Sequence, residues 1–182
     1  MSGYKIALIL YSHIEVRREI EIPDNISFLQ LHNIIQKIFN FDNYHMWDFQ
    51  VPEKLNENEV NLGNPIETIT YEDASNVKIK DYLDKNDVLL YVYDYGDNWE
   101  IVVHVMERTD YKNKTAVILD FNGKYGPIDD IGGPMVFEEI MESLDDEDEL
   151  LSILSDYGMD KTYLNKMDFT KKFKKGSKIR IQ

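Results

Sequence analysis

Residues 88–106 constrain the fold of this chain most strongly, because they contain two β-prone runs joined by a short polar turn. Residues 88–93 and 101–106 are rich in β-branched and aromatic side chains, which favour strands. Residues 96–98, with the sequence Gly-Asp-Asn, accept positive φ or bond their own backbone. The sequence therefore predicts a β-hairpin.

Alternation along the second strand of this hairpin places Trp99 and every second residue after it on one face, so we expect Trp99 to be buried. Asp94 and Asp97 flank the turn, where a strand end meets solvent. Turn aspartates commonly bond the turn backbone, and that role explains both residues. Alternatively, the two aspartates and Trp99 belong to a binding site on a rigid hairpin.

Composition bounds the class of protein. The chain has 182 residues with 43% hydrophobic content, which suits one globular domain. It contains no cysteine, so disulfides, zinc–thiolate sites, iron–sulfur clusters and cysteine nucleophiles are excluded. We find no signal-peptide pattern and no apolar run of membrane-spanning length. These features predict a cytoplasmic protein with no membrane partner.

The net charge of −14 is unevenly distributed. Residues 166–182 hold seven basic residues and one acidic residue, a charge of +6, so the remaining residues carry −14 − 6 = −20. We predict a single domain over residues 1–165 and a basic tail over residues 166–182, docked up to Phe173 and loose beyond Lys174. An acidic body repels phosphate, so only the tail offers a weak nucleic-acid contact.

The rest of the chain alternates strand and helix patterns. Ser27 and Gln30 form a capping-box pattern that opens a helix over residues 27–39. Residues 52–76 carry most of the turn signals and predict a long loop with one short strand near residues 67–70. Further strands are predicted over residues 4–11, 15–22, 45–51 and 116–121, a short strand or helical turn over 77–83, and C-terminal helices over 135–144 and 150–154.

Two histidines have ambiguous surroundings. His32 borders the apolar stripe of the predicted helix, where a histidine is more often a packing residue than a ligand. His45 shares a strand face with Trp47 and Phe49, so it is either a satisfied residue at the core edge or a site residue.

A structured loop is predicted over residues 122–134, which contain four glycines and two prolines. The loop lacks the glycine spacings of nucleotide cradles. It also lacks the glycine and closing glutamate of a calcium loop.

Several motifs follow one another along residues 4–165. They are Arg17 or Arg18 before Ile20-x-Ile22-Pro23, Leu31-His32, His45-x-x-x-Phe49, Tyr91-x-Tyr93-Asp94-x-Gly96-Asp97-x-Trp99, and Asp129-Asp130-Ile131-Gly132-Gly133. This order resembles the Ri-plasmid open-reading-frame-three-like family. The resemblance implies an α+β fold, with a β-grasp-like mixed sheet and a helix packed across it. The chain departs from the family pattern at Ile101, where many relatives carry histidine, and in lacking the cysteines of the Gly-Gly loop.

Three functions are compatible with these residues. We rank first a non-enzymatic binding or interaction module for an unknown protein or small-molecule ligand, with no cofactor and no zinc. A carboxylate and histidine enzyme, with magnesium or manganese as possible ions, is the alternative. Nucleic-acid association through the basic tail ranks third. The candidate binding residues are His45, Asp94, Gly96, Asp97, Trp99, Asp129, Asp130, Gly132, Gly133, Arg17 and His32.

Overall fold

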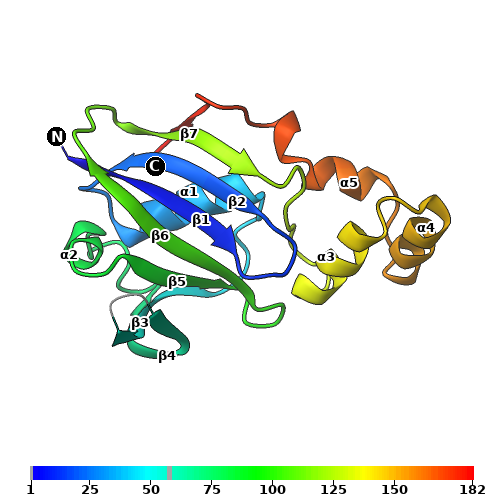
Figure 1. Ribbon diagram of the computed structural model, residues 1–182, viewed down its shortest axis with the longest axis horizontal. Helices are drawn as coiled ribbons and strands as arrows, with labels where there is room; N and C mark the ends of the chain where they lie inside the picture. Colours follow the sequence, from blue (N-terminus) through cyan, green and yellow to red (C-terminus); the bar gives the residue numbers. More distant parts are fainter. Residues whose placement is uncertain (1, 57–58) are drawn as a thin grey trace.

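One antiparallel sheet organises the protein in the computed structural model, which describes residues 2–56 and 59–182 (Figure 1). Within those residues the sheet has eight strands in the order β4-β3-β5-β6-β1-β2-β7-β8. The strands are β1 (Gly3–Leu10), β2 (Arg17–Pro23), β3 (Trp47–Asn56), β4 (Glu59–Thr70), β5 (Val88–Tyr93), β6 (Trp99–Thr109), β7 (Thr115–Asn122) and β8 (Lys178–Arg180).

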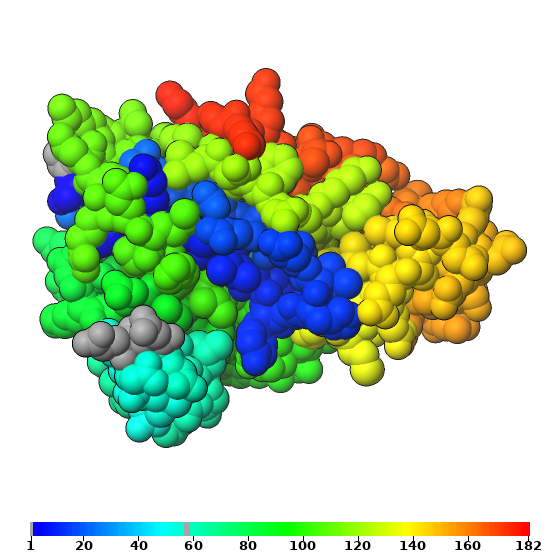
Figure 2. Space-filling view, viewed as in Figure 1, coloured from blue at the N-terminus to red at the C-terminus, as the bar shows by residue number. Residues whose placement is uncertain are grey.

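Helix α1 lies on one face of the sheet, α2 lies at the left-hand end in Figure 1, and the C-terminal helices lie beyond the opposite end. Helix α1 crosses the sheet behind β1 and β2, and α3, α4 and α5 extend from the right-hand end (Figure 1). In the space-filling view those C-terminal helices form the right-hand end of the molecule (Figure 2). The helices are α1 (Phe28–Phe39), α2 (Lys80–Leu83), α3 (Gly133–Glu142), α4 (Glu147–Asp156), α5 (Thr162–Met167) and a 3-10 turn, η1 (Phe169–Lys171).

The central hairpin and the covering helix are confirmed. Strands β5 and β6 pair antiparallel with Tyr93 opposite Trp99, and Trp99 is fully buried. The Trp99 ring packs beside Phe41 and Phe137, at centroid distances of 6.0 and 6.3 Å. Burial of alternate residues follows the predicted face, because this face of β6 covers the core.

Helix α1 begins with the predicted capping box. The hydroxyl of Ser27 accepts from the Gln30 backbone N–H at 3.2 Å, and the Gln30 side chain accepts from the Ser27 N–H at 3.0 Å. The helix ends at Asn40, whose φ of 61° and N–H bond to the Gln36 carbonyl close the last turn. These two caps fix where α1 begins and ends.

The predicted loop over residues 52–76 is wrong for most of its described length, although the short strand expected near residues 67–70 is present as the end of β4; residues 57 and 58 lie outside the described residues. Strand β3 continues to Asn56 and pairs with β4, so a long hairpin occupies most of this region. The pairing shifts register on both sides of Pro52, and most side chains of β4 are exposed. A hairpin held by backbone hydrogen bonds with little burial shows no hydrophobic alternation, which is why its turn-type residues indicated a loop.

The sheet is antiparallel in every pairing between the described strands, so the expectation of a mixed sheet is wrong. Three of the seven pairings, β1–β2, β3–β4 and β5–β6, join successive strands through short connections, which favours antiparallel pairing. An α+β fold is present, with a helix across the sheet. The closer likeness to a β-grasp stays a prediction.

The C-terminal segment is more ordered than predicted. Met167 and Phe169 are buried, as docking of residues 167–173 requires. The expected loose end beyond Lys174 is wrong, because β8 pairs with β7 and buries Ile179. Lys175 also forms an ion pair with Asp120 at 2.8 Å. The division into a domain over residues 1–165 and a tail over 166–182 stays a prediction.

Replacing Trp99 with alanine tests the role of the hairpin in the core. We expect Trp99→Ala to lower the free energy of unfolding by about 3–5 kcal/mol, as for other buried aromatic truncations. Denaturant unfolding would measure this loss. Met106→Ala on the exposed face of the same strand is the matched control and should stay within about 0.5 kcal/mol. An unchanged midpoint for Trp99→Ala would place the indole outside the core.

Deleting residues 174–182 tests the contribution of β8. We expect a lower melting temperature, because the deletion removes the backbone pairing with β7 and the buried side chain of Ile179. Ile179→Ala should reproduce part of the loss, about 2–5 kcal/mol for a buried aliphatic truncation. Lys178→Ala, at an exposed neighbour, should change little. A deletion variant that melts like the intact protein would show that β8 adds nothing to the fold.

Candidate functional site

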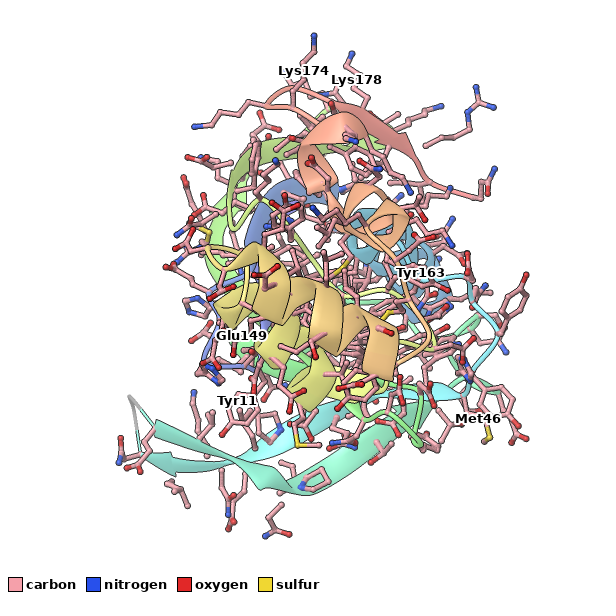
Figure 3. The ribbon with its side chains drawn as sticks, turned by 90° about the vertical axis from the view of Figure 1, so that its right-hand side faces the viewer. Tyr11, Met46, Glu149, Tyr163, Lys174 and Lys178 are labelled. Carbon is pink, nitrogen blue, oxygen red and sulfur yellow. The ribbon has the colours of Figure 1, made fainter. Side chains whose placement is uncertain are left out.

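Three loops meet at one end of the sheet and bring most of the predicted site residues together. His45 precedes β3, Asp94 and Asp97 lie in the β5–β6 turn, and Asp129 and Asp130 lie in the loop before α3. Met46, next to His45, marks this region on the lower right of Figure 3. We call His45, Asp94, Asp97, Asp129 and Asp130 the carboxylate cluster.

His45 sits between two carboxylates from different loops. Its Nε2 atom lies 3.5 Å from Oδ2 of Asp94 and 3.6 Å from Oδ1 of Asp130. These distances are longer than a hydrogen bond, and the buried Nε2 atom has no hydrogen-bond partner among the described residues. The side chain of Asp94 is 11% exposed and that of Asp130 is 80% exposed, so the pair spans the core edge and the surface.

Asp94 combines a turn role with a place in the cluster. Its φ is 56°, and its Oδ1 accepts from the Gly96 N–H at 2.9 Å. Its own N–H donates to the Met46 carbonyl at 2.9 Å, which ties the turn to the loop that carries His45. One carboxylate oxygen therefore caps the turn, as turn aspartates commonly do, and the other faces His45.

Gly133 lets the start of α3 approach the β5–β6 turn closely, and Gly132 leaves room for the side chain of Val136 in the same helix. A Cβ on Gly133, which has a φ of 80°, would come within 2.9 Å of the Asp97 carbonyl oxygen. A Cβ on Gly132, which has a φ of 100°, would come within 2.8 Å of Cγ2 of Val136. Both positions therefore need glycine, for the backbone angle and for the close approach.

Asp97 is the residue of the β5–β6 turn that Gly133 approaches. Burial raises the pKa of Asp97, and the charge of Asp94 raises it further. Hydrogen bonding from the backbone of Gly132 and Gly133 opposes this rise in the pKa. The Oδ2 atom of Asp97 is buried and has no partner among the described residues.

Asp129 is held by two donors and still has an unpaired oxygen. Its Oδ2 accepts from the Asp42 backbone N–H and from the Tyr93 hydroxyl, the latter at 3.1 Å. Burial raises the pKa of Asp129 despite these two bonds. Its Oδ1 atom is buried without a hydrogen-bond partner in the described chain. Burial and the charge of Asp129 also raise the pKa of Tyr93.

His32 lies in the core beneath the cluster. Its Nδ1 is 2.8 Å from the Tyr91 hydroxyl and its Nε2 is 2.7 Å from Oδ1 of Asn43, while its ring stacks on Trp47 at 3.8 Å. Burial lowers the pKa of His32 to about 4, so the ring is neutral at physiological pH. The packing interpretation therefore fits His32, which positions the loop before His45 through Asn43.

The remaining predicted residues lie below or outside the cluster. Trp99 is buried under the turn. The backbone N–H of Gly96 donates to Oδ1 of Asp94 within the turn. Arg17 lies on β2 in an ion pair with Glu19 at 2.9 Å. Its neighbour Arg18 is buried, with its guanidinium 4.2 Å from the Phe169 ring centroid. Arg18 thus serves the packing of the C-terminal segment.

Sequence reasoning missed Tyr93 as a site residue. Its side chain points to the core face, but its hydroxyl reaches Asp129 and accepts from the Tyr44 N–H at 3.3 Å. Alternation along β5 indicates that Tyr93 is buried, and a buried tyrosine hydroxyl usually needs a partner. That requirement was the available signal for a polar neighbour at this end of the sheet.

The cluster offers acceptors to a ligand that brings donors. Two carboxylate oxygens, Oδ2 of Asp97 and Oδ1 of Asp129, are buried without a hydrogen-bond partner among the described residues, and such groups are costly unless something pairs with them. Across residues 2–56 and 59–182, no group of three or more histidine or acidic side chains is arranged to hold a metal ion.

No helix in the same residues is both long enough and apolar enough to cross a membrane.

Replacing Asp97 with asparagine tests the cost of burying this carboxylate. The pKa of Asp97 is raised in the folded state, so the folded protein binds this proton more tightly than the unfolded chain does. The protonated carboxyl therefore adds stability at low pH, and this stability is lost as pH rises from the unfolded to the folded pKa. We expect Asp97→Asn to raise the melting temperature at neutral pH and to have no such effect below the ordinary aspartate range. Melting curves across pH would measure this. Asp145→Asn, at an exposed position, is the control. If Asp97→Asn melted at a lower temperature than the native protein at neutral pH, burial of the Asp97 carboxylate would not be what lowers stability there.

Comparisons with known proteins agree with the motifs. The family model for "Plasmid pRiA4b ORF-3-like protein" matches residues 3–170. Uncharacterized protein y4hQ of Sinorhizobium fredii (strain NBRC 101917 / NGR234) is 28% identical over 142 residues, covering 74% of this chain and 69% of that protein. The crystal structure of MM3350, a protein of unknown function from Methanosarcina mazei Go1, has the same fold, with a TM-score of 0.66 and 24% identity over 87% of this chain and 90% of that chain. The resemblance is confirmed, and the chain belongs to the plasmid pRiA4b ORF-3-like protein family.

Proposed function

We propose that this protein is a binding module that holds a lysine or arginine side chain of a partner protein in the carboxylate cluster. The observation that carries this proposal is the set of carboxylate oxygens beside His45, with Oδ2 of Asp94 at 3.5 Å and Oδ1 of Asp130 at 3.6 Å from its Nε2 atom and the Asp130 side chain 80% exposed. A group with several N–H donors and a positive charge satisfies such a set. Arginine, with five donors and a permanent charge, fits best.

The charge of the cluster favours a cation over other ligands. Asp94 and Asp130 lie within 3.6 Å of His45, and burial raises the pKa of the two further aspartates of the cluster, Asp97 and Asp129. An incoming cation stabilises the ionised carboxylates, because opposite charges attract strongly where water is partly excluded. Binding would therefore recover free energy that the unliganded protein loses at these two residues.

An exposed rim beside the cluster supplies apolar contact area. Tyr44, Met46 and Tyr95 are exposed by 81%, 53% and 51%, although they are large apolar or amphipathic side chains. Tyrosine and methionine are enriched at protein interfaces, and tyrosine rings attract cations. The Tyr95 hydroxyl donates to Oδ2 of Asp48 at 2.6 Å, which orders one ring of this rim. The rim therefore favours a protein partner over a bare ion.

Carboxylate catalysis is the second candidate function. The raised pKa values of Asp97 and Asp129 favour it, because groups that exchange protons near neutral pH often show such shifts. A catalytic role needs a substrate whose proton lies within hydrogen-bond reach of one of these carboxylates. Substrate turnover that depends on Asp129 would favour this candidate over the binding module.

The test of the binding module is a titration with N-acetyl-arginine amide and with a short arginine-containing peptide, followed by NMR. We expect chemical-shift changes at His45 and at the β5–β6 turn. Asp94→Asn/Asp130→Asn should weaken binding by roughly tenfold or more, since it removes two carboxylates facing the ligand. Asp145→Asn/Glu149→Gln removes the same charge from an exposed acidic run and is the matched control.

The outcomes separate a site from general attraction to an acidic protein. Equal weakening by the cluster variant and the control variant would contradict the proposal, because net charge alone would then explain the binding. The absence of any shift at His45 with either ligand at low salt would also contradict it. Acetyl-glutamine amide, which is neutral, should leave the spectrum unchanged.

A further inference from the structure

A basic groove lies between the end of α1 and the C-terminal segment, apart from the carboxylate cluster. It has a volume of about 410 Å³. Its lining contains no aspartate or glutamate but four basic residues, Lys37, Lys172, Lys178 and Arg180. In a chain with a net charge of −14, such a grouping of positive charge is unusual.

The four cations have no ion pair with a carboxylate in the described parts of the chain. The Lys37 ammonium donates to the Arg180 carbonyl and to Oε1 of Gln182, both at 3.3 Å, and Lys172 donates to the Asn40 side chain. Lys37 also offsets the negative end of the α1 dipole. Lys178 and Arg180, on β8, are the cations best placed to meet an anion.

The floor of the groove combines apolar and polar surface. Phe41 and Ile179 are buried there, and Phe173 lies beside them. Gln36 is also buried, and its Nε2 donates to the Tyr91 hydroxyl at 2.9 Å. Its Oε1 atom is buried and has no partner in the described residues. The groove therefore offers positive charge at its rim, apolar contact at its floor, and one unused acceptor.

We propose that this groove binds a phosphate ester of about nucleotide size. Lysine and arginine are the side chains that recognise phosphate most often. Ligand pockets of proteins commonly span about 300–1,000 Å³, a range that includes this groove. A flat or apolar group packs on the phenylalanines, and a hydroxyl or amino group donates to Gln36.

The charge of the whole protein favours a small anion over a long one. Outside residues 166–182 the chain carries −20. A nucleic-acid strand that extends beyond the groove meets this negative surface and is repelled, whereas a single phosphate ester stays within the positive region. We therefore expect the basic segment to recognise a single phosphate ester in the groove and to bind nucleic-acid strands poorly.

Calorimetry with the full-length protein tests the proposal, with ADP, adenosine, inorganic phosphate and a single-stranded oligonucleotide as probes. We expect ADP to bind, inorganic phosphate to compete with it, and adenosine to bind much more weakly. Lys178→Gln/Arg180→Gln should weaken ADP binding by roughly tenfold or more. Both side chains are exposed, so the fold should persist, and melting curves would verify it.

Lys171→Gln/Lys174→Gln is the matched control, because it removes the same charge from exposed positions that do not line the groove. Figure 3 shows Lys174 and Lys178 together at the top of the view, extending from the C-terminal segment. Equal loss of ADP binding in both double variants would overturn the proposal. So would no binding of ADP or phosphate at low salt, or an oligonucleotide that binds while ADP does not.

Discussion

The buried hydroxyl of Tyr91 connects the covering helix to the sheet, and the positions of both proposed binding regions depend on it. It lies 2.8 Å from Nδ1 of His32 and accepts from Nε2 of Gln36 at 2.9 Å. A buried hydroxyl that loses its partners costs free energy, so these bonds set the rotation and the height of α1 over β5. His32 then holds Asn43 at 2.7 Å, and the loop that begins at α1 inherits its position from the helix.

This loop carries residues of both regions. Phe41 packs against Tyr93 and lines the basic groove, while His45 belongs to the carboxylate cluster. The cluster itself is built from backbone conformations that are unfavourable for most residues, with positive φ at Asp94, Asp130, Gly132 and Gly133. The positive φ of the two aspartates and the raised pKa of Asp97 and Asp129 lower stability at this end of the sheet, whereas the glycines adopt positive φ without strain.

Sequence patterns predicted the parts of the fold that bury an alternating or helical stripe. The β5–β6 hairpin and α1 were found because their apolar periodicity and the Ser27 cap are local signals. The β3–β4 hairpin was predicted only at residues 45–51 and 67–70, and the rest was missed because its stability lies in backbone pairing; β8 was missed because only Ile179 of its three residues is buried. The candidate residues of the cluster were named from turn chemistry and family motifs. Their convergence, and the part of Tyr93, depend on contacts between loops far apart in sequence.

The two edges of the sheet show how the protein avoids pairing with copies of itself. Unpaired edge strands are templates for aggregation unless they are short, irregular or charged. At one edge, β4 lacks an N–H at Pro65 and its pairing with β3 changes register around Pro52. At the other edge, β8 spans three residues and presents Lys178 and Arg180 to solvent. A second copy that docked along β4 would find the row of backbone donors interrupted at Pro65. A second copy that docked along β8 would bring Lys178 and Arg180 close to residues of like charge.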